Sequence, residues 1–164
     1  MIAEFTEAPR SSPMKWNDEL NNVPPEERLR SAREANIASA AASAKPGAAV
    51  YGVEPAAGND GEQSFRSGRI VSIDPPNTIA DGARTLAIGQ RNFAVIRERV
   101  KDVVSVDDDT LLDTVKFAMY RTKLVIEPTG ALGLAALFAG KIRAKGPVAV
   151  VISGGNLDFS LLCR

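Results

Sequence analysis

The sequence has no histidine and a single cysteine among its 164 residues. Without imidazole, the chain excludes Ser-His-Asp triads, Cys-His pairs, imidazole zinc sites and imidazole acid–base catalysis. Cys163 alone excludes an internal disulfide and a cysteine-rich metal site. Any chemistry carried by this chain must therefore use carboxylates, lysine, hydroxyl groups, a hard metal ion or an organic cofactor.

The chain also has no excess of positive or negative charge and few aromatic side chains. The chain has 20 Lys and Arg residues against 20 Asp and Glu residues, and aromatic residues make up 5% of it. Because no basic excess can pair with phosphates and few rings can stack on bases, we expect no nucleic-acid partner. The apolar runs are too short to cross a bilayer, and residues 1–7 lack the order of a signal peptide. These features favour a cytoplasmic protein with no membrane partner.

Apolar segments that break into loops containing glycine or proline occur three times. They are Val50–Pro55, Leu124–Gly130 and Val150–Asp158. Alternation of helical and strand patterns favours an α/β fold with a parallel sheet, in a three-layer αβα arrangement. In such sheets, ligands bind at the carboxyl ends of the strands. The sequence therefore predicts one site assembled from these three loops.

The remaining pattern predicts the order of the elements. Proline, serine and asparagine interrupt residues 1–24, which we expect to be irregular. Residues 25–164 form the predicted domain, which begins with a helix over 25–44. Further strands are predicted at 48–53, 69–73, 103–106, 124–126 and 148–152. Further helices are predicted near 63–67, 84–89 and 93–100, after the acidic run 107–109, and at 130–139.

A possible cation site lies in the loop after the strand at 48–53. The carboxylates of Glu54 and Asp60 are six residues apart, with the Gly58 carbonyl between them. If the loop folds back on itself, this all-oxygen set suits Mg²⁺ or Ca²⁺ rather than zinc. The alternative is a solvated acidic loop without a ligand, and spacing alone favours that alternative.

Three other motifs have structural interpretations beside functional ones. Glu127 precedes a helix and acts either as its cap or as a carboxylate in a site. The turn Ser153–Asn156 lets backbone approach a ligand, and its serine suits a ring nitrogen, but a tight turn explains it equally well. Thr78–Gly82 is by itself a capped turn, and the acidic run 107–109 is a helix cap to which we assign no function. The chain contains neither GxxxxGK[ST] nor GxGxxG.

Taken in order, four segments resemble the serine/threonine dehydratase and serine racemase family of pyridoxal 5′-phosphate (PLP) enzymes of fold type II. They read YGVEP (51–55), TIADG (78–82), IEPTG (126–130) and SGGNLD (153–158), and the resemblance covers about residues 37–158.

The resemblance implies a role for each candidate residue. Ser153 would hydrogen-bond the pyridine nitrogen, and Gly82, Glu127 and Gly154 would lie beside the cofactor. Glu54, Gly58 and Asp60 would match the family's Mg²⁺ or Ca²⁺ site. A hydroxyl partner leaves the ring nitrogen unprotonated, which favours elimination over transamination.

Two family features are missing from the sequence. No Ser-Phe-Lys-x-Arg-Gly segment supplies the Schiff-base lysine, and residues 28–35 stand where the family has a run of four glycines. We therefore expect a partial large domain with no catalytic residue of its own. The implied reaction is the conversion of L-threonine or L-serine to a 2-oxo acid and ammonia, with the chain inactive by itself.

Other functions remain open at this point. Serine racemase is the alternative enzyme, and the alternative class is a non-catalytic interaction or regulatory fragment, or a gene remnant. Half of a sheet leaves an apolar face and a strand edge uncovered. We therefore expect a homo-oligomer, or pairing with a full-length relative.

Overall fold

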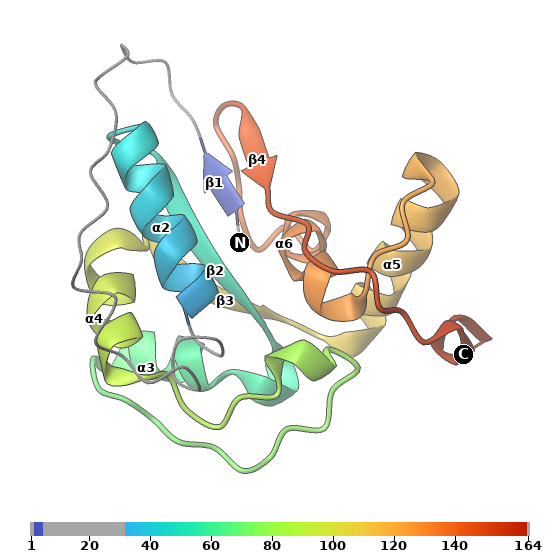
Figure 1. The fold of residues 1–164 in the computed structure, drawn as a ribbon, viewed down its shortest axis with the longest axis horizontal. Helices are drawn as coiled ribbons and strands as arrows, with labels where there is room; N and C mark the ends of the chain where they lie inside the picture. Colours follow the sequence, from blue (N-terminus) through green and yellow to red (C-terminus); the bar gives the residue numbers. More distant parts are fainter. Residues whose placement is uncertain (1, 5–31, 164) are drawn as a thin grey trace.

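A computed structural model describes residues 2–4 and 32–163, and it contains one mixed sheet with the strand order β3-β2-β1-β4 (Figure 1). The strands are β1 (Ile2–Glu4), β2 (Ala49–Pro55), β3 (Asp102–Val106) and β4 (Val148–Val150). β2 and β3 are parallel, whereas β1 is antiparallel to both β2 and β4. β2, β3 and β4 therefore run in one direction and end at the same edge of the sheet.

Helices cover both faces of this sheet. They are α2 (Ala32–Ala44), α3 (Asp60–Ser67), α4 (Gln90–Arg99), α5 (Asp108–Thr122) and α6 (Pro128–Phe138). Short 3₁₀ turns occur at η2 (Ala56–Gly58), η3 (Asp81–Ala83) and η4 (Phe159–Cys163). α2 and α4 lie together on one side of the strands, and α5 and α6 lie on the other (Figure 1). The predicted α/β class and its three layers are thus confirmed.

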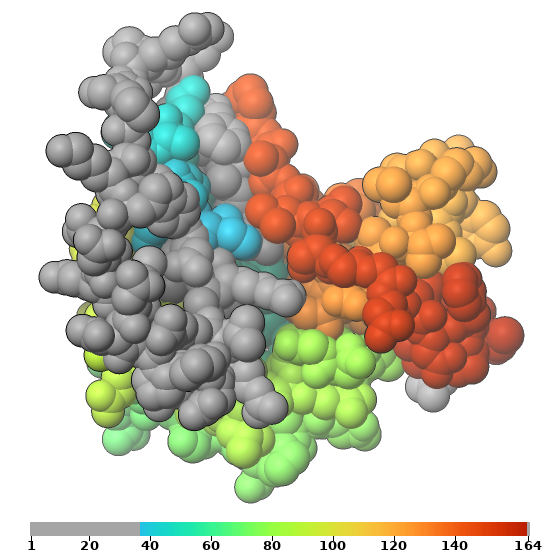
Figure 2. All heavy atoms as spheres, in the orientation of Figure 1, coloured from blue at the N-terminus to red at the C-terminus, as the bar shows by residue number. Residues whose placement is uncertain are grey.

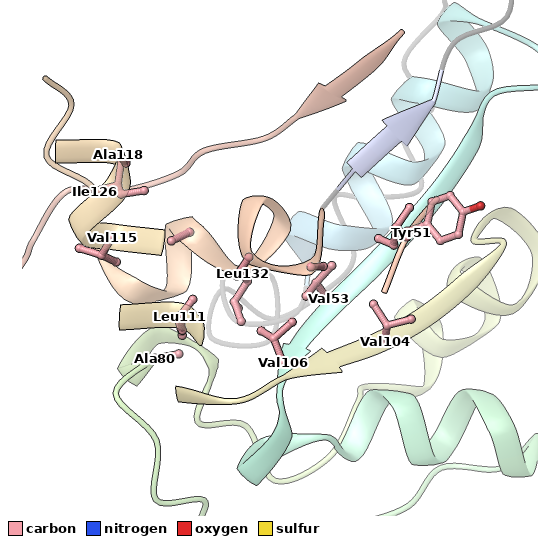
Figure 3. Packing of buried hydrophobic residues seen from close by; sticks show 14 of the residues in the cluster. Tyr51, Val53, Ala80, Val104, Val106, Leu111, Val115, Ala118, Ile126 and Leu132 are labelled. Atoms are coloured by element: carbon pink, nitrogen blue, oxygen red, sulfur yellow. The ribbon is translucent and has the colours of Figure 1, made fainter. Parts of the chain in front are cut away.

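Alternating side chains divide the interior into two apolar clusters, one on each face of the sheet. Val50 and Val103 pack with Ala38, Ile96 and Val100 beneath α2 and α4. The next residues along the strands face the other way and meet α5 and α6 (Figure 3). The buried residues of this larger cluster include Tyr51, Val53, Val104, Val106, Leu111, Val115 and Leu132. Both faces of β2 and β3 are covered, as their nearly continuous apolar runs predict.

Several predicted elements agree with the structure. The helix predicted at 93–100 is the C-terminal part of α4, and the one at 130–139 is α6. Asp107 caps α5, because its carboxylate accepts the Thr110 backbone N–H at 2.7 Å. The helix predicted over 25–44 is described only as α2, from Ala32 onward, and residues 25–31 lie outside the described residues.

Three predicted elements were wrong. The strand expected at 69–73 is an extended segment without a ladder partner, since Val71 N–H donates to the Ser64 hydroxyl and Ile73 N–H donates to the Leu86 carbonyl. Residues 84–89 form no helix. The segment 124–126 pairs with no strand, and only Ile126 of its three residues is buried. In each case tertiary partners, rather than local apolar pattern, decide the backbone.

The N-terminus also differs from the prediction. Ile2–Glu4 lies inside the segment expected to be irregular, yet it forms β1 between β2 and β4. Its antiparallel pairing makes the sheet mixed rather than wholly parallel. Three residues carry too short a pattern to reveal a strand. Within residues 2–4 and 32–163, no helix is both long and apolar enough to span a bilayer.

Candidate cofactor site

The site lies where β2 and β4 end and α6 begins. β2 ends at Pro55 and leads into the loop that carries Gly58 and Asp60, while β4 ends at Val150 and leads into the turn 153–156. α6 starts at Pro128 with Glu127 at its N-cap position. Its first turn faces the turn 153–156 and the loop around η3, so two of the three loops predicted to form one site, those after residues 124–126 and after β4, lie against each other.

The Glu127 carboxylate binds the turn after β4 rather than its own helix. It makes no capping hydrogen bond to α6. Its Oε2 accepts the Asn156 backbone N–H at 3.2 Å, and its own backbone N–H donates to the Gly154 carbonyl at 3.3 Å. Glu127 therefore occupies the N-cap position that the cap interpretation predicts, but its carboxylate joins α6 to the turn 153–156 instead of capping an N–H of the helix.

Two glycines make this contact possible. Gly154 has φ +78°, and a β-carbon there would overlap the Glu127 carboxylate. A β-carbon on Gly130 would overlap the Ser153 carbonyl oxygen. The backbone of α6 and the backbone of the turn thus touch directly, which only glycine permits at these two positions.

Gly82 reaches the same helix turn from the other side. Its backbone N–H donates to the Thr129 hydroxyl at 3.1 Å and to the Asp81 carboxylate at 2.8 Å. Thr129 is a site residue that sequence reasoning did not single out. Its position in the first turn of α6, directly after Glu127-Pro128, was the available signal. α6 therefore holds Gly82 through Thr129, and Gly154 and Asn156 through Glu127.

Ser153 opens the turn, at the edge of this arrangement. The residue is half-buried, and its hydroxyl has no hydrogen-bond partner among residues 2–4 and 32–163. The Gly154 and Gly155 backbones beside it are exposed. An unpaired hydroxyl next to accessible backbone fits the ring nitrogen of a planar cofactor, which needs one partner and close approach.

The predicted cation loop folds back against the start of α3. Glu54 Oε1 accepts the Gly61 N–H at 3.2 Å, and Oε2 accepts the Glu62 N–H at 2.8 Å, so this carboxylate anchors the start of α3. Gly58 is buried against Pro76. Asp60 Oδ1 accepts a hydrogen bond from the Thr85 hydroxyl at 3.1 Å.

Asp60 is the unusual member of this loop. Its side chain is fully buried, and Oδ2 has no hydrogen-bond partner among the described residues. Burial raises the pKa of this carboxyl above its ordinary value of 3.8, against the opposing effect of the Thr85 hydrogen bond. A buried carboxylate oxygen without a partner is costly, and a cation would satisfy it. In the described part of the chain no three acidic, histidine or cysteine side chains converge, so carbonyls or water must complete any such site.

Comparison with known proteins identifies the family of the chain. Residues 35–154 match the family described as pyridoxal-phosphate dependent enzyme. The chain belongs to this family. The serine racemase of Schizosaccharomyces pombe is 52% identical over 115 residues, and the L-threo-3-hydroxyaspartate ammonia-lyase of Saccharomyces cerevisiae is 50% identical over 123 residues. These matches cover 70% and 74% of this chain but only 36% and 38% of the relatives.

Solved structures of the family share the fold. The threonine deaminase of T.th. is 43% identical with a TM-score of 0.73, and maize serine racemase is 34% identical with a TM-score of 0.69. The alignments cover 77% and 79% of this chain, and 46% and 41% of those chains. The chain thus spans less than half the length of the relatives that it matches.

The contact between Gly154 and Glu127 predicts an unequal cost for two alanine substitutions. Gly140 has φ +66° with open space around it, whereas Gly154 combines positive φ with the carboxylate contact. Both Gly140→Ala and Gly154→Ala should lower the free energy of unfolding by about 1–2 kcal/mol, because a side chain is strained in the left-handed backbone conformation. Gly154→Ala should lose roughly 1–3 kcal/mol more through overlap. Urea unfolding measures the free energy of unfolding of both variants. Equal losses in the two variants would contradict the contact. So would an extra loss in Gly154→Ala that persists when Glu127→Ala is added.

Proposed function

We propose that this chain provides the face that holds the pyridine ring, together with the cation loop, in a PLP-dependent site for small β-hydroxy amino acids. The observation that carries the proposal is the joining of Gly82, Gly154 and Asn156 to one helix turn by Thr129 and Glu127. Membership of the PLP family and the ammonia-lyase relatives support it.

The proposed reaction is the dehydration and deamination of L-serine or L-threonine. The substrate loses its α-proton and its β-hydroxyl as water, and later uptake of water releases ammonia and a 2-oxo acid. PLP, when bound, withdraws electrons from the bond at the substrate α-carbon. The residues of this chain would bind and orient the ring.

Each candidate residue has a distinct task in this proposal. Ser153 would donate its hydroxyl to the ring nitrogen and leave that nitrogen uncharged, which tempers electron withdrawal and favours elimination. Gly82 and Gly154 would allow the ring to lie close to the backbone. Glu127 would hold the turn that carries Ser153 in place. Glu54, the Gly58 carbonyl and Asp60 would bind Mg²⁺ or Ca²⁺ beside this site.

Serine racemase activity is a second candidate with equal support. The S. pombe racemase and the yeast ammonia-lyase are almost equally similar to this chain, at 52% and 50% identity. Both reactions begin with removal of the α-proton, and they differ in whether the β-hydroxyl leaves or a proton returns to the opposite face. The groups that decide this would contact the substrate, and none of the candidate residues here is assigned to it.

The chain alone should not catalyse either reaction. No lysine stands in a segment like that of the family, so the covalent link to PLP has no dedicated residue. With purified chain, PLP and L-serine or L-threonine, we expect no release of 2-oxo acid above a no-protein control. Borohydride reduction followed by peptide mapping should show PLP spread over surface lysines. Deamination linked to one dominant modified lysine would contradict this prediction.

The hydroxyl of Ser153 should matter for binding a ring that cannot react with lysine. Pyridoxamine 5′-phosphate is such a probe, and titration calorimetry measures its affinity. Ser153→Ala should weaken binding by roughly three- to tenfold, the value of one ordinary hydrogen bond. Ser160→Ala, which removes an exposed serine hydroxyl from η4, should leave affinity unchanged. Equal affinities for wild type and Ser153→Ala would contradict the proposed role of Ser153.

The unpartnered oxygen of Asp60 predicts a response to divalent cations. At roughly 100-fold excess over the dissociation constant, Mg²⁺ or Ca²⁺ should add about 2.7 kcal/mol to the free energy of unfolding. Asp60→Asn should be insensitive to the cation, because the amide is a poorer ligand without charge. Asp74→Asn, a matched change at an exposed carboxylate in a neighbouring loop, should respond as wild type does. An equal response of Asp60→Asn and wild type in thermal unfolding would exclude the loop as the binding site.

A further inference from the structure

The loop that carries Gly82 is held by a carboxylate from a different helix. Asp108 is the first residue of α5, and its two oxygens serve different groups of the loop. Oδ1 accepts the Thr78 hydroxyl at 2.5 Å, and Oδ2 accepts the Ile79 backbone N–H at 2.9 Å. Hydrogen bonds to a charged acceptor are stronger than neutral ones, so this two-point contact is a firm attachment.

Thr78 is bound from a second direction as well. Its carbonyl accepts two hydrogen bonds from the Arg84 guanidinium, from Nε at 3.0 Å and from Nη2 at 2.6 Å. Its hydroxyl also accepts the Ala80 N–H at 3.2 Å. Thr78 is 2% exposed and Ala80 is fully buried. The start of the loop is therefore fixed by contacts that leave little freedom for a change of backbone conformation.

This attachment lies four residues before the glycine that faces the proposed cofactor position. Between them the chain passes through buried Ala80 and enters η3, within which Gly82 N–H meets Thr129. α5 and α6 pack against each other through the larger core. Asp108 thus fixes one end of the segment, and Thr129 fixes the other.

We infer that Asp108 is a positioning residue, which sets the place of the Gly82 backbone against the cofactor ring through its contacts with Thr78 and Ile79. It acts through the loop and touches no reacting group. This inference rests on the proposed cofactor site. It gives a function to one member of the acidic run 107–109 that the sequence pattern explains as helix capping alone.

A general role in helix α5 is the competing explanation, and neighbouring residues separate the two. Asp107 is the residue that caps α5, through Thr110. Asp109 lies in the same first turn as Asp108, has an exposed side chain and carries the same charge. Both acids interact favourably with the helix dipole. Asp109→Asn therefore removes a charge that interacts with the dipole of α5 and leaves the hydrogen bonds to Thr78 and Ile79 in place. It is the matched control for Asp108→Asn.

The first measurement is hydrogen exchange at single amides in the purified chain without any ligand. In Asp108→Asn, exchange at the Ile79 and Gly82 amides should accelerate by about tenfold or more, because a hydrogen bond to a charged group is lost. Amides in β2 and β3 should keep their rates, and Asp109→Asn should match wild type. Unchanged exchange at Ile79 and Gly82, or acceleration everywhere, would overturn the inference. If Asp108→Asn does not fold, Thr78→Val removes the partner hydroxyl and is judged by the same criteria.

The second measurement links the loop to the cofactor, with pyridoxamine 5′-phosphate as the probe. Asp108→Asn should bind it at least about fivefold more weakly than Asp109→Asn, since a loose loop must be ordered on binding. Equal affinities together with faster loop exchange would overturn the link to the cofactor. If wild type binds no probe at all, the proposed function fails. The exchange rates still decide whether Asp108 holds the loop, so the two failures are distinguishable.

Discussion

The site depends on the direct contact between the first turn of α6 and the turn that follows β4. No side chain separates the two backbones, because a β-carbon on Gly130 would overlap the Ser153 carbonyl. That approach lets the Glu127 carboxylate reach the Asn156 N–H, and it places Gly154 against the same carboxylate. Without it, α6 could not hold both loops at once. The end of one strand and the start of one helix therefore fix the orientation of Ser153.

The segment 78–85 connects this contact to the loop proposed to bind a cation. Asp108 holds its start, Thr129 holds its middle through Gly82, and the Thr85 hydroxyl at its end binds Asp60. It has little regular structure beyond one 3₁₀ turn, so these polar contacts replace a ladder or helix as the source of its shape. One hydrogen bond, from Thr85 to Asp60, and the chain 82–85 therefore separate Asp60 from the Gly82 backbone.

The space-filling view illustrates what remains uncovered (Figure 2). Residues 151–163 continue from β4 along the side of the molecule beside α5. Val151 and Ile152 lead into the turn 153–156 and are 38% and 41% exposed. Leu124 and Val125, which precede Glu127, are about half exposed. Apolar side chains on both segments that enter the site suit further protein packed there. Association with itself or with a full-length relative stays a prediction.

Sequence patterns predicted the parts of this fold that local chemistry controls. The runs around Val50 and Val103 form strands because both faces of the sheet are covered, and Asp107 caps α5 through a contact three residues away. Two of the motifs, at 126–130 and 153–158, also predicted loops that lie together. The roles of Thr129, Asp108 and Thr85 could not be read in this way, since their partners are 25 to 47 residues distant in sequence. Hydrogen bonds to Ser64 and Leu86 take the place of a strand ladder at 69–73, and Thr85, in the segment predicted as a helix at 84–89, binds Asp60.

The most direct test of this account is to map the amides that respond to pyridoxamine 5′-phosphate by ¹⁵N NMR titration of the chain. The account predicts shifts that are saturable and concentrated in three segments, residues 80–83, 127–130 and 153–156, with Ser153 and Gly154 among the largest. Saturable shifts centred on another surface, or shifts only at exposed lysines, would contradict the proposal that this edge of the sheet is a cofactor-binding face.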